Sequence, residues 1–202
     1  MMETKVLDII IAFVKGIKDH PKENKNAPHH YIDDGTNTLW AAGYLLNQIL
    51  RQYKIPKNHI YVSVKAQEKW NELTDQKIED YTYTMGVPLK CDAILDLYKG
   101  AEENPTDKGK PFSKGSKFKY RQVFHDEHII PISMVIEKLI NLETLDHHSV
   151  QKVINNIYIC KMLKTENINL NKKFKTTRYW DFEKTKNEIY KAVGIEILPI
   201  SL

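Results

Sequence analysis

Apolar residues recur at helical spacing in three stretches of the chain. Residues 3–19 place valine, isoleucine and phenylalanine three and four positions apart, which is typical of a helix with one buried face. A second stretch of this kind ends near Tyr53. A third follows Asp181, a residue suited to cap it, and stops at Gly194. The pattern therefore predicts an amphipathic helix in each of these three places.

The segments between them mix strand and helix signals. His59–Val64 alternates and is rich in β-branched residues, so we expect a short strand there and a helix around Gln67–Leu73. Gly86-Val87-Pro88 breaks the chain, and a helix is expected around Leu89–Leu97 after it. Gly, Pro, Ser and Lys dominate Gly100–Ser116, which favours a loop.

The last third of the chain predicts a pair of strands separated by an insertion and followed by a helix. We expect a strand at Tyr120–His128, followed by a helix or loop insertion at Ile132–Leu142. A short helical turn at Val150–Asn155 then leads to a second strand at Asn156–Cys160, and a helix follows at Thr165–Phe174. The expected fold class is α+β, largely helical around a small β-finger.

The composition is that of a globular protein without a membrane span. The chain has 202 residues, 42% of them apolar, which is enough for one globular domain with an elaboration. The apolar stretch Val6–Val14 is too short to span a bilayer and contains Asp8. Two cysteines that lie far apart, Cys91 and Cys160, suit a reducing compartment. We expect a cytoplasmic protein that does not associate with membranes.

The net charge of +4 is concentrated in two basic segments. Residues 108–121 contain six basic side chains and no acid, and residues 161–178 contain six against the single acid Glu166. Such clusters bind phosphate backbones through counterion release. A solvated lysine-rich surface is the alternative interpretation for either segment alone. The two basic segments lie on either side of Phe124–Pro131, which carries the candidate catalytic residues, and this position favours a nucleic-acid partner.

Between the basic segments the chain places a carboxylate beside a histidine, in Phe124–Pro131. Asparagines follow at Asn156 and Asn167. A carboxylate and an amide oxygen can hold a hard cation such as Mg²⁺, which keeps several waters. An imidazole with a pKa near neutrality can take a proton from an attacking water. This combination predicts a metal-dependent nuclease.

These residues resemble the HNH endonucleases, also called ββα-metal or His-Me finger nucleases. Glu127-His128-Ile129-Ile130-Pro131 is similar to the first motif of that family. Asn156-Ile157-Tyr158-Ile159-Cys160 resembles its middle element. Glu166-Asn167, followed by Asn171-Lys172, resembles the helix that closes the finger. The resemblance covers roughly residues 120 to 175.

The resemblance implies a role for each matching residue. Glu127 and Asn167 would be the metal ligands, for Mg²⁺ or Mn²⁺, and His128 would be the general base. Asn156 would be the structural asparagine that ties the finger's loop to its second strand. Lys172, on the closing helix, would neutralise nonbridging phosphate oxygens.

Two features depart from the commonest family pattern. The gap between Asn156 and Asn167 is longer, so that Thr165 or Glu166 is an alternative to Asn167 as second ligand. The chain has no paired cysteines for a zinc knuckle, so no zinc is expected. His125 lies two residues before Glu127 on the same strand face and is a further candidate for metal or phosphate contact.

The expected partner is double-stranded DNA, and cutting both strands implies a homodimer. The predicted DNA contacts are Lys114, Lys117, Lys119, Arg121, Lys173 and Arg178, with Trp180 as a possible addition. We expect a helical region for DNA recognition or dimerisation at 1–105, the nuclease finger at 106–178, and a C-terminal helix with an extended tail at 179–202.

This organisation resembles that of type II restriction endonucleases, and a site-specific restriction enzyme is the leading hypothesis. A nonspecific HNH nuclease, such as a toxin, mobile-element or antiphage effector, is the main alternative. A non-catalytic DNA-binding module is a weaker one. A third interpretation takes His125-Asp126 as the dipeptide of an HD-type phosphohydrolase, which would require an all-helical fold and a helical dipeptide.

Overall fold

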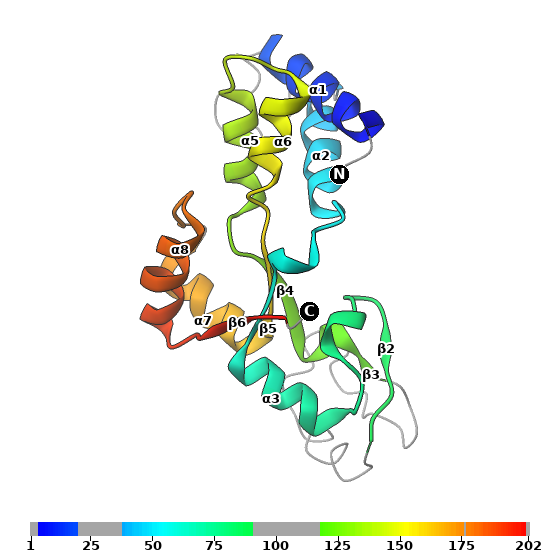
Figure 1. Ribbon diagram of the computed structural model, residues 1–202, viewed down its shortest axis with the longest axis vertical. Coiled ribbons are helices and arrows are strands. Elements are labelled where there is room, and N and C mark those ends of the chain that lie inside the picture. The colour runs from blue at the N-terminus through cyan, green and yellow to red at the C-terminus, as the bar shows by residue number, and fades with distance from the viewer. Residues whose placement is uncertain (1–3, 20–37, 91–117, 176, 201–202) are drawn as a thin grey trace. The chain divides into compact units, whose positions relative to one another are not determined.

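A computed structural model describes residues 4–19, 38–90, 118–175 and 177–200 (Figure 1). The chain divides into two units, each assembled from segments that are distant in the sequence. The first unit contains Met1–Ile55, His128–Tyr158 and Arg178–Phe182, and the second contains Pro56–Glu127, Ile159–Thr177 and Glu183–Leu202.

The first unit is built mainly from helices. These are α1 (Thr4–Asp19), α2 (Thr38–Arg51), α5 (Ile132–Ile140) and α6 (His147–Ile154) (Figure 1). In α1 the buried residues follow helical spacing and form one apolar face that packs into the core: Leu7, Ile10, Val14 and Ile17. The Asp146 carboxylate caps α6 by accepting a hydrogen bond from the Ser149 N–H at 2.7 Å, which lowers the pKa of Asp146.

The second unit contains a mixed sheet of four strands. In spatial order these are β4 (Phe124–His128), β5 (Ile159–Leu163), β1 (Ile60–Ser63) and β6 (Ile197–Pro199). Strand β1 runs parallel to β5 and antiparallel to β6. The sheet therefore joins strands from the first, middle and last parts of the chain.

Two backbone hydrogen bonds fix the pairing of β4 with β5. The Ile129 N–H donates to the Tyr158 carbonyl at 3.0 Å, and the Lys164 N–H donates to the Val123 carbonyl at 2.9 Å. From the first bond to the second, the residue number falls along β4 and rises along β5, so the two strands are antiparallel. In this register the residues that lie opposite each other include Asp126 with Lys161 and Glu127 with Cys160.

An aromatic cluster fills the core between the sheet and helix α3 (Val64–Leu73). Trp70, from α3, is fully buried. Its ring centroid lies 5.0 Å from that of Tyr81, 5.3 Å from that of Phe124 and 5.9 Å from that of Tyr120. These tilted and edge-on contacts are the favourable geometries for aromatic pairs.

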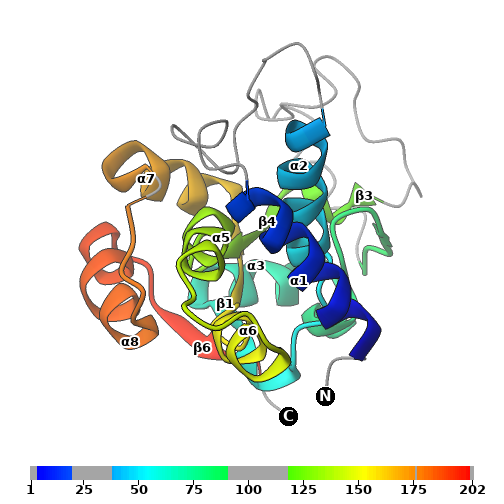
Figure 2. The ribbon, with the colours of Figure 1, turned by 90° about the horizontal axis from the view of Figure 1, so that it is seen from above.

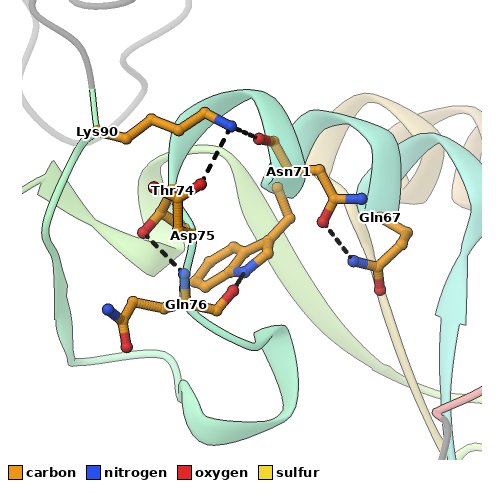
Figure 3. A network of polar contacts seen from close by, with 7 residues as sticks. Gln67, Asn71, Thr74, Asp75, Gln76 and Lys90 are labelled. Atoms are coloured by element: carbon orange, nitrogen blue, oxygen red, sulfur yellow. Dashed lines mark hydrogen bonds and ion pairs between the residues drawn. The ribbon is translucent and has the colours of Figure 1, made fainter.

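Polar contacts close the C-terminal end of α3 around this indole (Figure 3). The Trp70 indole N–H donates to the Gln76 carbonyl at 2.7 Å, which satisfies its buried polar atom. The Lys90 ammonium bonds to the Asn71 carbonyl and lies 3.5 Å from Asp75. The chain after α3 is thereby folded back against the helix.

Helix α7 (Lys164–Phe174) begins directly after β5. Figure 2 shows it beside the C-terminal helical segment, which consists of α8 (Phe182–Lys184), a π-helical part (Thr185–Tyr190) and a 3₁₀ turn (Lys191–Val193). Gly194 ends this segment with φ of 72°, a left-handed conformation that glycine adopts without strain.

The α+β class predicted from sequence is confirmed, and most elements lie where the periodicity predicts them. The N-terminal helix, the strand near residue 60, the helix before Thr74 and the helix after Leu163 all form. The segment that allowed either helix or loop after Pro131 is helix α5. Gly194 ends the C-terminal helical segment as predicted.

Two strand predictions are partly wrong. Tyr120–Gln122 is a 3₁₀ turn, because the Gln122 side chain accepts a hydrogen bond from the Lys119 N–H at 2.7 Å. Strand β4 therefore begins only at Phe124. The second strand begins at Ile159 rather than Asn156, because the amides before it still bond to carbonyls of α6.

The break predicted at Gly86-Val87-Pro88 is also wrong in part. Gly86–Val87 forms strand β2, which pairs antiparallel with β3 (Phe118–Lys119). Leu89 and Lys90 are not helical, and the rest of the helix predicted there lies outside the described residues. The predicted loop Gly100–Ser116 and the boundary between residues 105 and 106 also lie outside them.

Replacement of Trp70 by alanine is expected to lower the free energy of unfolding by about 3–5 kcal/mol, because it empties the centre of the aromatic core. Urea unfolding followed by circular dichroism measures the loss. Ile168→Ala is the control, since Ile168 is 62% exposed and its truncation should change stability by less than about 0.5 kcal/mol. Equal losses in the two variants would contradict the position of Trp70 in the core.

Candidate active site

Strand β4 carries two neighbouring carboxylates that face opposite sides of the sheet. His125 and Glu127 share one face, where His125 Nε2 lies 3.4 Å from Glu127 Oε2. Asp126 lies on the other face and accepts a hydrogen bond from the Tyr120 hydroxyl at 2.8 Å. Neighbouring side chains of a strand alternate between its two faces in this way. The Glu127 side chain keeps 16% of its surface exposed.

The Asp126 side of the sheet is occupied by an internal cation. Lys161 is 4% exposed, and its ammonium donates to the Tyr81 carbonyl at 2.6 Å and lies 3.5 Å from Asp126 Oδ1. Its Nζ also lies 4.9 Å from the centroid of the Tyr120 ring. Burial, and then the Asp126 charge, raise the pKa of Tyr120 well above its ordinary value. Lys161, counted above in the second basic segment, is therefore part of the core.

Glu166 anchors α7 to the sheet. It is 6% exposed, and its Oε2 accepts hydrogen bonds from the Ser63 hydroxyl at 2.5 Å and from the Leu163 N–H at 3.0 Å. Ser63 in turn caps α3 by accepting the Ala66 N–H at 3.1 Å. One carboxylate therefore joins the start of α7 to the start of α3. Sequence reasoning considered Glu166 only as a metal ligand and missed this structural role.

The thiol of Cys160, on strand β5, is buried close to three carboxylates. Burial raises the pKa of this thiol well above its ordinary value, and the charges of Glu166, Glu127 and Asp126 raise it further. Cys160 is therefore a neutral thiol of the interior.

Asn167 and Lys172 both lie on α7, beyond its anchored first turn. Asn167 is partly buried, and its side-chain oxygen accepts a hydrogen bond from the Asn171 amide at 2.9 Å. Lys172 is exposed and has no acidic partner among the described residues. Thr165, the other alternative ligand, is exposed on the first turn.

His128 and Asn156 belong to the first unit. His128 is the last residue of β4, and the chain bends at the two fully buried isoleucines that follow it. The Asn156 side-chain amide donates to the Lys152 carbonyl at 2.9 Å and more weakly to the Val153 carbonyl at 3.4 Å. Asn156 therefore closes the end of α6, whereas the resemblance implied bonds to the second strand.

Four of the predicted DNA contacts lie at or before the turn that leads into β4. Lys119 is exposed. Arg121 is partly buried, with its guanidinium carbon 5.5 Å from the centroid of the Tyr83 ring. Lys114 and Lys117 lie outside the described residues.

The other three predicted contacts differ in burial: Lys173 is exposed, whereas Arg178 and Trp180 are not. The Lys173 ammonium donates to the Ala192 carbonyl at 2.9 Å. Arg178 is only 6% exposed. Trp180 is partly buried against the helical core of the first unit, with the Lys138 ammonium 5.6 Å from its ring. The surface charge available to a partner is therefore smaller than the residue counts indicate.

The donors fit a hard cation in type. Glu127 offers a carboxylate and Asn167 an amide oxygen, and Mg²⁺ typically keeps several waters while using one or two protein carboxylates. Among the residues placed by the structure, no three His, Cys, Asp or Glu side chains gather as a ligand group.

No protein-family model, curated protein or solved structure matches the chain. Within the described ranges, no helix is both long enough and apolar enough to cross a membrane.

Loss of the Glu166 carboxylate is expected to destabilise the protein. Glu166→Ala leaves the buried Ser63 hydroxyl and the Leu163 N–H without an acceptor and should cost about 2–3 kcal/mol, while Glu166→Gln, which keeps an oxygen there, should cost less. A double-mutant cycle tests the Glu166–Ser63 hydrogen bond. Urea unfolding is measured for Glu166→Ala, Ser63→Ala and the double variant, and the expected coupling energy is about 1–3 kcal/mol. Additive losses would contradict the bond.

Proposed function

We propose that the protein is a metal-dependent DNA endonuclease of the HNH type. The observation that carries the proposal is the order of elements: antiparallel strands β4 and β5, then α7 directly after β5, with Glu127-His128 at the end of β4. This is the strand, strand and helix order that the resemblance implies. The strand ends directly after these two residues.

Each residue of the motif has a proposed task. His128 takes the proton from the attacking water. Glu127 and Asn167 would hold Mg²⁺ or Mn²⁺, and the ion would supply positive charge that stabilises the developing negative charge of the phosphate. His125, 3.4 Å from Glu127, orients that carboxylate. Lys172, exposed on α7, neutralises a nonbridging oxygen of the phosphate.

The proposed substrate is double-stranded DNA, and the proposed enzyme is a site-specific restriction endonuclease. One finger cuts one strand, so double-strand cleavage requires two copies of the chain, most simply a homodimer. The helices of the first unit are available for recognition or dimer contacts. A nonspecific nuclease with the same chemistry is the alternative, and the cleavage pattern decides between them.

The HD-phosphohydrolase interpretation is disfavoured by the fold. His125-Asp126 lies in strand β4, whereas the dipeptide of that family lies on a helix. Asp126 is moreover engaged by Tyr120 and Lys161. A binding module without catalysis remains the other alternative, and it is separated from a nuclease by activity alone.

Incubation of purified protein with a long unmethylated phage DNA tests the proposal. With Mg²⁺, the wild type should produce discrete fragments, and EDTA should abolish them. His128→Ala should lower the cleavage rate by at least about 100-fold, which is the usual contribution of a general base. Glu127→Gln should lower it too, with partial rescue at high Mg²⁺ or Mn²⁺. Gel electrophoresis over time measures each rate.

Matched controls use residues of the same type away from β4. His147→Ala and Glu72→Ala alter an exposed histidine and an exposed glutamate, and both should cleave at the wild-type rate. A smear that depends on metal and His128 would identify a nonspecific nuclease. Equal cleavage by wild type and His128→Ala would refute the base, and tight DNA binding without cleavage would establish a binding module.

A further inference from the structure

Backbone hydrogen bonds bring three chain segments together at the end of the β4–β5 pair opposite to His128. The Lys164 N–H, at the start of α7, donates to the Val123 carbonyl at 2.9 Å. The Tyr120 N–H, at the start of the preceding turn, donates to the Met85 carbonyl at 3.1 Å. The side chains of Arg121, Lys164 and Tyr83 are presented from these three segments.

The two cations of this cluster are arranged at an energetic cost. Arg121 has a buried Nε that makes no hydrogen bond within the described part of the chain. Burial, and then the nearby Arg121 charge, lower the pKa of Lys164. Among the described residues, no acidic side chain pairs with either cation. Within the part of the chain that the structure describes, no acidic side chain offsets their mutual repulsion.

The position of Lys164 on its helix adds to this cost. It is the first residue of α7, where the helix dipole disfavours a positive charge. An anion held between Arg121 and Lys164 would relieve both effects. A negative group from a partner would therefore be bound favourably between these two side chains.

An exposed aromatic ring lies against the same cations. Tyr83 is 48% exposed, with the Arg121 guanidinium over its ring, and the neighbouring Met85 is 42% exposed. A ring of this kind can stack on a base or pack against a sugar. A phosphate beside an aromatic platform is the chemistry of a nucleotide in a nucleic-acid strand.

We propose that Arg121 and Lys164 together hold one backbone phosphate, and that Tyr83 packs against the adjoining nucleotide. The inference rests on the DNA substrate of the proposed function. It goes beyond that function by assigning Lys164 and Tyr83 and by pairing Arg121 with a particular second cation. The site lies at the far end of the strand pair from His128, so it binds the DNA backbone away from the reacting phosphate.

Binding measured without catalysis tests the pair. Fluorescence anisotropy of a labelled duplex in EDTA, repeated over a range of salt concentrations, gives the salt slope of the affinity. Because both cations contact one phosphate, the double variant Arg121→Gln/Lys164→Gln should lower the salt slope by about one unit. Contacts to two separate phosphates would lower it by about two. Tyr83→Leu should weaken binding at an unchanged slope. Lys65→Gln, an exposed lysine on α3, is the control and should leave the slope unchanged.

The stability of Lys164→Gln separates lost contacts from lost folding. Removing a cation from the helix N-terminus should leave thermal stability equal or higher while DNA binding falls. Arg121→Lys, which keeps the charge, should retain most of the salt slope. An unchanged slope in the double variant, with His128-dependent cleavage intact, would overturn this inference and leave the proposed function standing. Weaker binding by the variants of a protein that never cleaves would support the inference and refute the nuclease.

Discussion

The carboxylate of Glu166 is the contact on which the arrangement of the second unit depends. It is buried, and a buried charge is tolerated only when donors surround it. The Ser63 hydroxyl and the Leu163 amide supply two such donors. Because Ser63 also begins α3, this one group fixes where both helices leave the sheet. Asn167 directly follows Glu166 on α7, so the hydrogen bonds of Glu166 also fix where Asn167 lies. The proposed metal ligand is therefore positioned by its neighbour.

Strand β4 shows how one short segment can serve both stability and chemistry. Its Asp126 face is closed by Lys161 and Tyr120 and belongs to the interior. Its Glu127 face retains exposed surface, and His125 Nε2 lies 3.4 Å from the Glu127 carboxylate there. Alternation along the strand separates the two carboxylates, so the internal one can be neutralised without engaging the other. A site with an accessible carboxylate next to a tightly packed core follows from this separation.

The sequence predicted what depends on local patterns and missed what depends on distant contacts. Periodicity located α1 and α7, and alternation located β1, because neighbouring residues set those patterns. The role of Glu166 could not be read in this way, since its partner Ser63 is 103 positions away. The turn at Tyr120 was missed for a similar reason, because the aromatic core captures a residue that suits a strand equally well. The motif at Glu127-His128 was found because its residues are consecutive.

Lys161 and Lys164 show why a count of basic residues is a weak guide to a binding surface. They are three positions apart and were indistinguishable in the sequence. Lys161 is buried beside Asp126, so its charge is neutralised within the core. Lys164 stands at a helix N-terminus next to another cation, where both the helix dipole and Arg121 oppose its charge. A lysine that stabilises the fold tells nothing about a partner. A lysine whose charge the described part of the fold opposes is the better candidate for contact with an anionic partner, and Lys164 is therefore the one assigned to the proposed phosphate.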